Sequence, residues 1–251
     1  MTRIDLNCDL GEGAGHDAEL MPLVTSANIA CGGHAGDAGT MRATVALAAR
    51  HRVAIGAHPG FEDRPNFGRA ERTLPAGEVR ALVARQVRAL AEMAHAEGQR
   101  LAHVKPHGGL YNLAARDRQV AGEIAEAVWE LEPRLILVGL AGSQLVEAGR
   151  ARGLDIAHEA FADRAYAPDG SLVPRTQPGA LVGDAAAAAA QGVRLVREGR
   201  VCAVDGTIIV VRADTLCLHG DGPGAAVFAQ RLRAGLESSG IVLQALQGRG
   251  S

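Results

Sequence analysis

The chain has 251 residues, of which 47% are apolar and 22% charged, a composition ordinary for a globular protein with one sizeable core. The net charge of -2 at pH 7 gives no sign of a nucleic-acid partner or of binding to a membrane surface. The start, MTRIDLNCDL, lacks the apolar run of a signal peptide, and no stretch is long enough to cross a bilayer. We therefore expect a cytoplasmic protein whose four cysteines, which lack metal-site spacing, are reduced thiols.

Short extended runs alternate with helical stretches along the whole chain. The expected strands cover 3–9, 24–31, 53–58, 101–107, 135–140, 154–159 and 214–219. The expected helices cover 37–51, 75–97, 118–131, 143–152, 184–198 and 224–238. Asp37 is a plausible N-cap, and Pro75 and Gly98 fit the start and the end of the second helix. Such alternation predicts parallel strands covered by helices, in the α/β class.

We expect a single domain over 1–251, because no repeat or low-complexity linker marks a boundary. The exception to the alternation is 160–183, which we predict to be a long loop or hairpin insertion around Asp169-Gly170. A short flexible tail is expected from about residue 247.

The stretch HVKPHGGLYN, residues 103–112, places basic side chains on one face of an expected strand that ends at a Gly-Gly turn. Lys105 in this stretch is the only lysine among 26 basic residues. Lysine is a compact donor that can titrate when buried, whereas arginine is a larger planar fork that stays charged. The choice of lysine favours a specific role for Lys105.

Polar residues gather at the carboxyl ends of the expected strands, where parallel α/β folds carry their active sites. The strand ends contribute Asp9, Glu12, Asn28, His34, Asp37, His58, Lys105, His107, Glu159, Arg164 and His219. A single such residue is more often a helix cap or a satisfied core group. Their repeated occurrence at six strand ends indicates a site.

Several motifs are excluded. The run DLNCDLGEG lacks the glycine and the final glutamate of a calcium loop. His103 and His107 would lie ~13 Å apart on a strand, too far to ligate one ion, so a metal would need ligands from different strands, such as Asp9, His34, His58 or His107. There is no phosphate-binding loop, no dinucleotide fingerprint and no Gly-x-Ser-x-Gly turn, and GDGPG at 220–224 favours an ordinary strand-to-helix turn.

Six motifs in order, DLNCDLGEG, NIACGGHAGD, GAHPG with FGR, HVKPHGGLYN, FADRAY with LVPR, and CLHGD, resemble the LamB/YcsF family from about Ile4 to about Gly240. The resemblance implies a distorted (β/α) barrel similar to the glycoside hydrolase/deacetylase superfamily. It departs at Gly33, where the family usually has an aromatic residue before His34.

The resemblance also implies an activity, that of the A subunit of the bacterial ATP-dependent 5-oxoprolinase. This hydrolase converts 5-oxo-L-proline (pyroglutamate), ATP and water to L-glutamate, ADP and phosphate. A lactam is a stabilised amide, and phosphorylation of its oxygen makes the ring carbon electrophilic. Because this chain shows no nucleotide motif, we expect partner subunits B and C to use the ATP and this chain to open the ring. A homo-oligomer and a divalent metal both stay open.

On this basis Asp9, with Glu12 or Glu159 as alternatives, would position or deprotonate water. Lys105 with His107 or His58 would stabilise negative charge, and one histidine would protonate the ring nitrogen; we also count His34 with this catalytic group. Arg164 and Arg175, and less directly Arg69, would hold a carboxylate or phosphate. The remaining substrate-side residues, with orienting or capping roles, are Asn28, Asp37, Tyr111 and His219.

Two alternatives remain at this point, because a fold does not fix a function. One is a metal-dependent amidase or sugar deacetylase of the same superfamily, with the polar residues around a divalent ion. The other is a non-catalytic subunit that binds a lactam or carbohydrate.

Overall fold

Seven parallel strands close into a barrel in the computed structural model, which describes residues 1–219 and 224–248. The strands are β1 (Arg3–Leu10), β2 (Ser26–Ala30), β3 (Ala54–His58), β4 (Leu101–Val104), β5 (Ile136–Leu140), β6 (Asp155–Phe161) and β9 (Thr215–His219). The barrel closes because β9 pairs with both β6 and β1. The expected distorted (β/α) barrel is confirmed, with seven strands in place of the usual eight.

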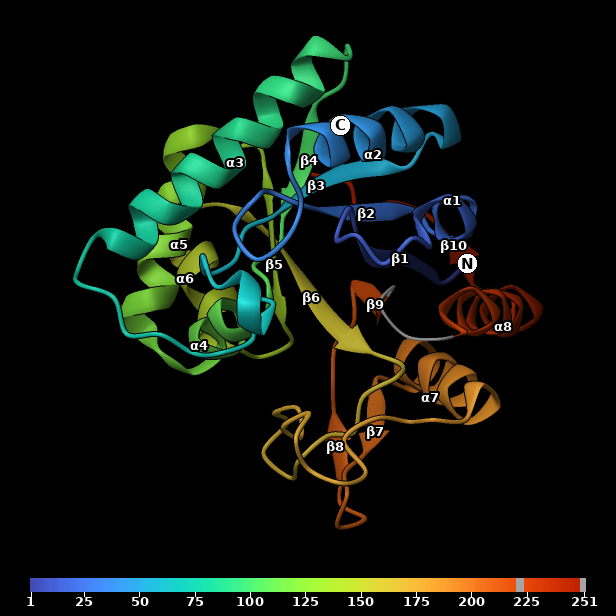
Figure 1. The fold of residues 1–251 in the computed structure, drawn as a ribbon. Helices are drawn as coiled ribbons and strands as arrows, with labels where there is room; N and C mark the ends of the chain where they lie inside the picture. Colours follow the sequence, from blue (N-terminus) through green and yellow to red (C-terminus); the bar gives the residue numbers. More distant parts are fainter. Residues whose placement is uncertain (220–223, 249–251) are drawn as a thin grey trace.

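Helices surround this barrel (Figure 1). They are α1 (Asp17–Leu20), α2 (Ala38–His51), α3 (Glu78–Ala96), α4 (Gly108–Arg116), α5 (Arg118–Leu131), α6 (Gln144–Arg152), α7 (Ala185–Glu198) and α8 (Ala225–Ser238), with short 3-10 turns η1 (Met21–Leu23) and η2 (Arg64–Asn66). The six expected helices correspond to α2, α3, α5, α6, α7 and α8. Among the described residues no helix is long and apolar enough to span a bilayer.

Strand β1 shows how the chain divides its apolar and polar residues. Residues 4–10 are all buried. Leu6, Cys8 and Leu10 belong to the apolar core, whereas the alternate residues Asp5, Asn7 and Asp9 bond to side chains of other strands inside the barrel. The alternation of a strand thus places an apolar face outward under the helices and a polar face inward. Since unpaired buried polar groups are costly, the interior needs a connected hydrogen-bond network.

The prediction of a strand over 101–107 that ends at a Gly-Gly turn is wrong. Strand β4 ends at Val104, and Gly108 and Gly109 are the first two residues of helix α4. Gly108 has a φ of 51°, and a side chain there would lie 2.8 Å from the carbonyl oxygen of Gly68. Gly109 N–H donates to that same oxygen at 2.9 Å. The two glycines therefore allow a close approach between this helix start and the loop before α3, a long-range contact that overrides their weak helix propensity.

The insertion at 160–183 contains isolated antiparallel bridges between Arg164 and Leu181 and between Tyr166 and Leu172. A separate antiparallel hairpin, β7 (Arg200–Cys202) with β8 (Ile208–Val210), lies beside this loop and was not expected (Figure 1). Strand β10 (Val242–Leu243) pairs with the start of β1. Most of the GDGPG stretch and the end of the expected tail lie outside the described residues.

Candidate active site

A cavity of about 730 Å³ opens where the barrel strands end. Ten of the residues singled out from the sequence line it: Asp9, Glu12, Arg69, His58, Lys105, His107, Tyr111, Arg164, Arg175 and His219. Asn28, His34 and Glu159 lie in direct contact with this group and are buried. The tertiary structure therefore brings together side chains from β1, β2, β3, β6, β9 and the segment after β4.

Asp37 is the exception. It is exposed at the N-terminus of α2, where its carboxylate accepts a hydrogen bond from Thr40 N–H at 2.8 Å. It does not line the cavity. Its position is that of a helix cap, the other role considered for it.

Lys105 lies at the centre of the barrel between two carboxylates. Its Nζ donates to Asp9 Oδ1 at 2.7 Å and lies 3.2 Å from Glu159 Oε1. All three side chains are at most 7% exposed. Asn28 completes the arrangement by donating to Asp9 Oδ1 at 2.9 Å. The only lysine of the sequence thus lies in a small, enclosed space that suits a compact positive charge.

The charge states of this pair follow from the contacts. Burial raises the pKa of Asp9, but His58 and Lys105 lower it further, and the net pKa lies well below its usual value. Burial likewise opposes the charge of Lys105, but Asp9 and Glu159 raise its pKa well above the usual value. Both groups therefore stay ionised at neutral pH, because each opposite charge outweighs desolvation.

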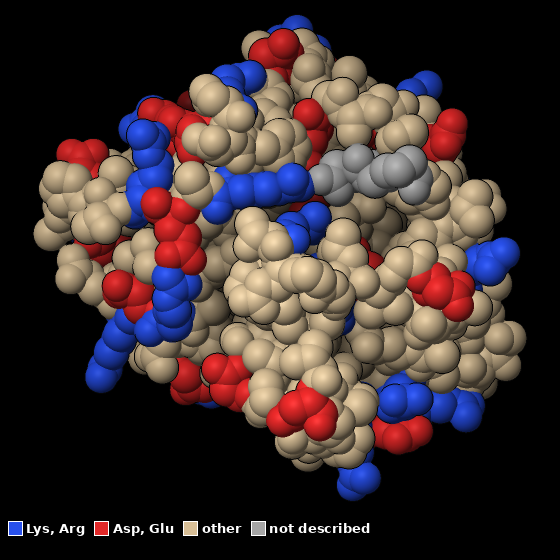
Figure 2. Space-filling model, turned by 60° about the horizontal axis from the view of Figure 1, so that its bottom comes forward, with Lys and Arg blue, Asp and Glu red and all other residues tan. Residues whose placement is uncertain are grey.

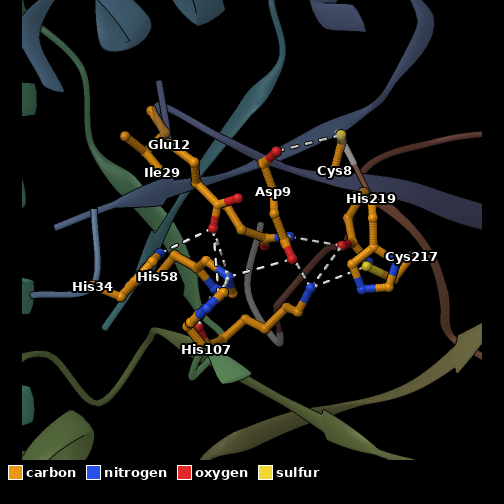
Figure 3. Close-up of polar contacts among 12 residues, drawn as sticks. Cys8, Asp9, Glu12, Ile29, His34, His58, His107, Cys217 and His219 are labelled. Carbon is orange, nitrogen blue, oxygen red and sulfur yellow. Dashed lines mark hydrogen bonds and ion pairs between the residues drawn. The ribbon is translucent and has the colours of Figure 1, made fainter. Parts of the chain in front are cut away.

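Three histidines surround the carboxylate of Glu12 (Figure 3). Glu12 Oε1 lies 2.9 Å from His34 Nε2, 3.4 Å from His107 Nδ1 and 3.9 Å from His58 Nε2. His58 Nε2 is also 2.9 Å from His107 Nδ1 and 3.3 Å from Asp9 Oδ2. We call Glu12, His34, His58 and His107 the histidine–glutamate cluster.

Backbone carbonyl groups hold two of these rings. His58 Nδ1 lies 2.7 Å from the carbonyl oxygen of Lys105, and His107 Nε2 lies 2.9 Å from that of Phe67. Burial, with the neighbouring His58, lowers the pKa of His34 to about 2. The same causes lower the pKa of His107 well below its usual value. Desolvation therefore keeps His34 and His107 neutral.

A fourth histidine, His219, lies on the other side of Asp9 (Figure 3). His219 Nδ1 lies 2.7 Å from Asp163 Oδ2, and its ring stacks on Phe161 with centroids 5.8 Å apart. Burial raises the pKa of Asp163, but the paired His219 lowers it to below the usual value. An ionised carboxylate therefore fixes the orientation of an imidazole at the cavity wall.

Arginines form another part of the wall. Arg69, Arg116, Arg164 and Arg175 line the cavity, and Figure 2 shows basic side chains beside a hollow near the centre of this face. Arg164 is held in place by a hydrogen bond that its guanidinium group donates to the carbonyl oxygen of Val173 at 2.7 Å. Burial, and then the charge of Arg175, lower the pKa of Arg164. Two guanidinium groups close enough to disfavour one another favour an anion between them.

Gly33 lies against the buried side chain of Gln86. A side chain there would begin 2.5 Å from Nε2 of the buried Gln86. The Gln86 amide holds both the N–H and the carbonyl of Gly60, at 3.0 and 2.7 Å. Gln86 therefore fills the space beside Gly33 and fixes the loop that follows His58.

Sequence reasoning missed other residues of the site. Asn7 bonds to Glu159, Thr215 and Asn28 inside the barrel. His103 Nε2 lies 2.7 Å from Asn28 Oδ1. The alternation of Asp5, Asn7 and Asp9 along β1 was the available signal for Asn7, since alternate residues share one face of a strand. No local pattern marks Arg116, which reaches the cavity from α4.

Comparisons with known proteins agree with this architecture. The LamB/YcsF family profile matches residues 4–250. The crystal structure of Lactam Utilization Protein from Thermus thermophilus is 48% identical and has a TM-score of 0.92, covering 97% of this chain and 100% of that chain.

More distant similarities show the fold alone. A putative cellobiose-phosphate cleavage protein from Enterococcus faecalis V583 is 12% identical with a TM-score of 0.54, covering 96% of each chain. The Bc1960 peptidoglycan N-acetylglucosamine deacetylase is 11% identical with a TM-score of 0.50, covering 97% of this chain and 86% of that chain. The barrel fold is thus shared with a deacetylase.

Proposed function

Because the chain belongs to the LamB/YcsF family, we propose that it is the A subunit of an ATP-dependent 5-oxoprolinase and opens the lactam ring of 5-oxo-L-proline. The observation that carries the proposal is the cavity, whose lining combines carboxylates, histidines and arginines. The match to the family profile over residues 4–250 supports it. The name of the 48% identical relative, a lactam utilization protein, supports a lactam substrate.

The chemistry explains why such an enzyme would use ATP. Transfer of the γ-phosphoryl group to the amide oxygen, by partner subunits B and C, makes the ring carbon electrophilic. One water then adds to that carbon, the carbon–nitrogen bond breaks, and the nitrogen takes a proton, which leaves an acyl phosphate. A second water releases phosphate and gives L-glutamate, so that two waters are consumed in all.

The residues divide these tasks according to their positions. Asp9 Oδ1 is held by Lys105 and Asn28, and Oδ2 lies 3.3 Å from His58 Nε2. Because Asp9 lines the cavity, its positioned carboxylate would orient the attacking water. The His219 ring, oriented by Asp163, would deliver the proton to the ring nitrogen. Arg164 and Arg175 would bind the substrate carboxylate or the phosphoryl group.

The role of Lys105 is more indirect than its charge alone indicates. Its ammonium group is already shared by Asp9 and Glu159. We assign it to holding Asp9 ionised and correctly placed, with stabilisation of negative charge on the substrate as a secondary effect.

A second candidate is a metal-dependent amidase or deacetylase that works without ATP. The histidine–glutamate cluster favours it, because these are ligands that hold a divalent ion. A divalent ion there, held by Glu12 and histidines of the cluster, would polarise a carbonyl or phosphoryl oxygen. Hydrolysis of a simple lactam or N-acetyl amide by the isolated chain, with metal and without ATP, would support this candidate.

Reconstitution of the chain with purified subunits B and C tests the proposal. We expect L-glutamate to form from 5-oxo-L-proline and ATP only when all three are present, and no ATP hydrolysis by this chain alone. Robust ATP turnover by the pure chain would contradict the division of tasks. Full glutamate production without this chain would contradict the proposal as a whole.

A further inference from the structure

His58 and His107 have fixed tautomers in this structure. A carbonyl oxygen can only accept a hydrogen bond, so His58 Nδ1 must donate to Lys105 and His107 Nε2 must donate to Phe67. The other nitrogens, His58 Nε2 and His107 Nδ1, face one another and can each bind an ion through a lone pair. These two nitrogens are 2.9 Å apart. At that distance a cation must lie between them, either a proton or a metal ion.

We propose that this species is a divalent transition-metal ion of the zinc type, bound by Glu12 Oε1, His58 Nε2 and His107 Nδ1. Two nitrogens and one carboxylate oxygen suit zinc and its neighbours and not magnesium or calcium, which take oxygen ligands. The site lies in the cavity already described, but the inference stands apart from the proposed reaction because it uses no property of the substrate.

The spacing of the three atoms fits such an ion. Their mutual distances are 2.9, 3.4 and 3.9 Å. Bonds of about 2.0–2.1 Å to a tetrahedral ion place its ligand atoms roughly 3.3 Å apart. The observed distances bracket this value, and small side-chain rotations would equalise them. Three protein ligands would leave a fourth position for water or substrate, and all three residues line the cavity.

Ring orientation separates the ligands from His34. The lone pair of an imidazole nitrogen lies in the ring plane, so an ion shared by two rings must lie in both planes. The planes of His58 and His107 are inclined at 85°, and they therefore intersect. His34 and His107 stack with an angle of 5° and centroids 3.6 Å apart, so their planes have no common point near the site. His34 instead donates from Nε2 to Glu12, and it orients that carboxylate.

Titration of the metal-free chain with Co²⁺, followed by visible absorption and by competition with Zn²⁺, tests the site without any assay of activity. We expect one ion per chain, an absorption band typical of four-coordinate Co²⁺, and a higher melting temperature with Zn²⁺. His58→Gln and His107→Gln should abolish binding. His34→Gln should keep the stoichiometry and weaken binding by about 10- to 100-fold.

The matched control is His158→Gln, because His158 is a buried histidine on β6 that does not belong to the cluster. It should bind Co²⁺ as the wild type does. If the ligand variants fail to fold, X-ray absorption of the zinc-loaded wild type still tests the inference, with two imidazole ligands expected. A correctly folded wild type that binds no ion would show that a proton bridges His58 and His107 and would overturn the proposal. Binding that persists in both ligand variants would also overturn it.

Discussion

Lys105 Nζ lies 2.7 Å from Asp9 Oδ1, and both side chains are almost fully removed from solvent. Glu159 faces the same ammonium group at 3.2 Å. One positive charge therefore compensates two buried carboxylates at the centre of the barrel. The network keeps Asp9 ionised, and its loss affects stability as well as chemistry.

Replacing Lys105 with methionine should lower the free energy of unfolding by about 3–5 kcal/mol, because two buried carboxylates lose their counter-charge. Urea unfolding measures this change. The double variant Lys105→Met/Glu159→Gln should recover part of the loss. Arg85→Met, which breaks an exposed pair with Glu62, should cost at most about 1 kcal/mol. A Lys105→Met protein as stable as the wild type would show that the buried ion pair is absent.

Asp9→Asn should reduce ring opening in the reconstituted assay by at least about a hundredfold, because the amide cannot orient or accept a proton from water as a carboxylate does. Asp5 provides the comparison on the same strand. It is buried deeper in the barrel, where it accepts hydrogen bonds from Thr25, Ser26 and Thr215. Asp5→Asn should keep most of the turnover and act mainly on stability. If Asp5→Asn abolished turnover while Asp9→Asn kept it, the active site would not lie at the end of the barrel assigned to it.

His103 should make the protein sensitive to acid. Burial, with the charges of Lys105 and His58, lowers its pKa from 6.5 to about 3. The unfolded chain therefore binds a proton below pH 6.5 that the folded protein does not bind. This contribution to stability is present above pH 6.5 and is lost as the pH falls, by up to about 1.4 kcal/mol per pH unit.

The comparison between wild type and His103→Gln isolates this contribution, since the other titrating groups are common to both. Urea unfolding at several pH values should show the wild type losing stability faster than the variant between pH 6.5 and pH 4. Parallel profiles would contradict the expectation.

Arg175→Ala should raise the KM for 5-oxo-L-proline by about 10- to 100-fold, the loss expected for a hydrogen bond to a charged group. Arg175 lines the cavity, whereas Arg88 lies exposed on α3 and away from it. Arg88→Ala is therefore the matched control, with unchanged KM. Equal KM values for Arg175→Ala and the wild type would remove this arginine from the anion site.

Asp37→Ala tests whether this residue is a cap or a ligand of the substrate. Loss of its hydrogen bond to Thr40 N–H should lower the melting temperature of the protein. Turnover should stay near that of the wild type, and Asp37→Ser should restore the stability. A large rise in KM with normal stability would return Asp37 to the substrate site.

The sequence by itself determined the order of strands and helices and the end of the barrel that carries polar residues. Alternation along β1 separates Leu6 and Cys8 from Asn7 and Asp9, and this separation depends only on strand geometry. The ends of α5 and α6 follow from the helix-ending residues Pro133 and Gly153 beyond them. Asp9, His58, Lys105 and His219 could be chosen because each closes or follows a strand.

Only the tertiary structure decided how these residues pair. The carbonyl groups of Lys105 and Phe67 select the tautomers of His58 and His107 across 47 and 40 residues of sequence, and no local pattern encodes such contacts. The helix α4 begins at two glycines because the backbone of Gly68 packs against them. Asp37 is an acidic residue that follows a strand, as a site residue would, but it lies at the N-terminus of α2 and caps that helix. Local sequence reports propensity and periodicity, whereas ligand sets and hydrogen-bond partners depend on which distant segments the closed barrel brings together.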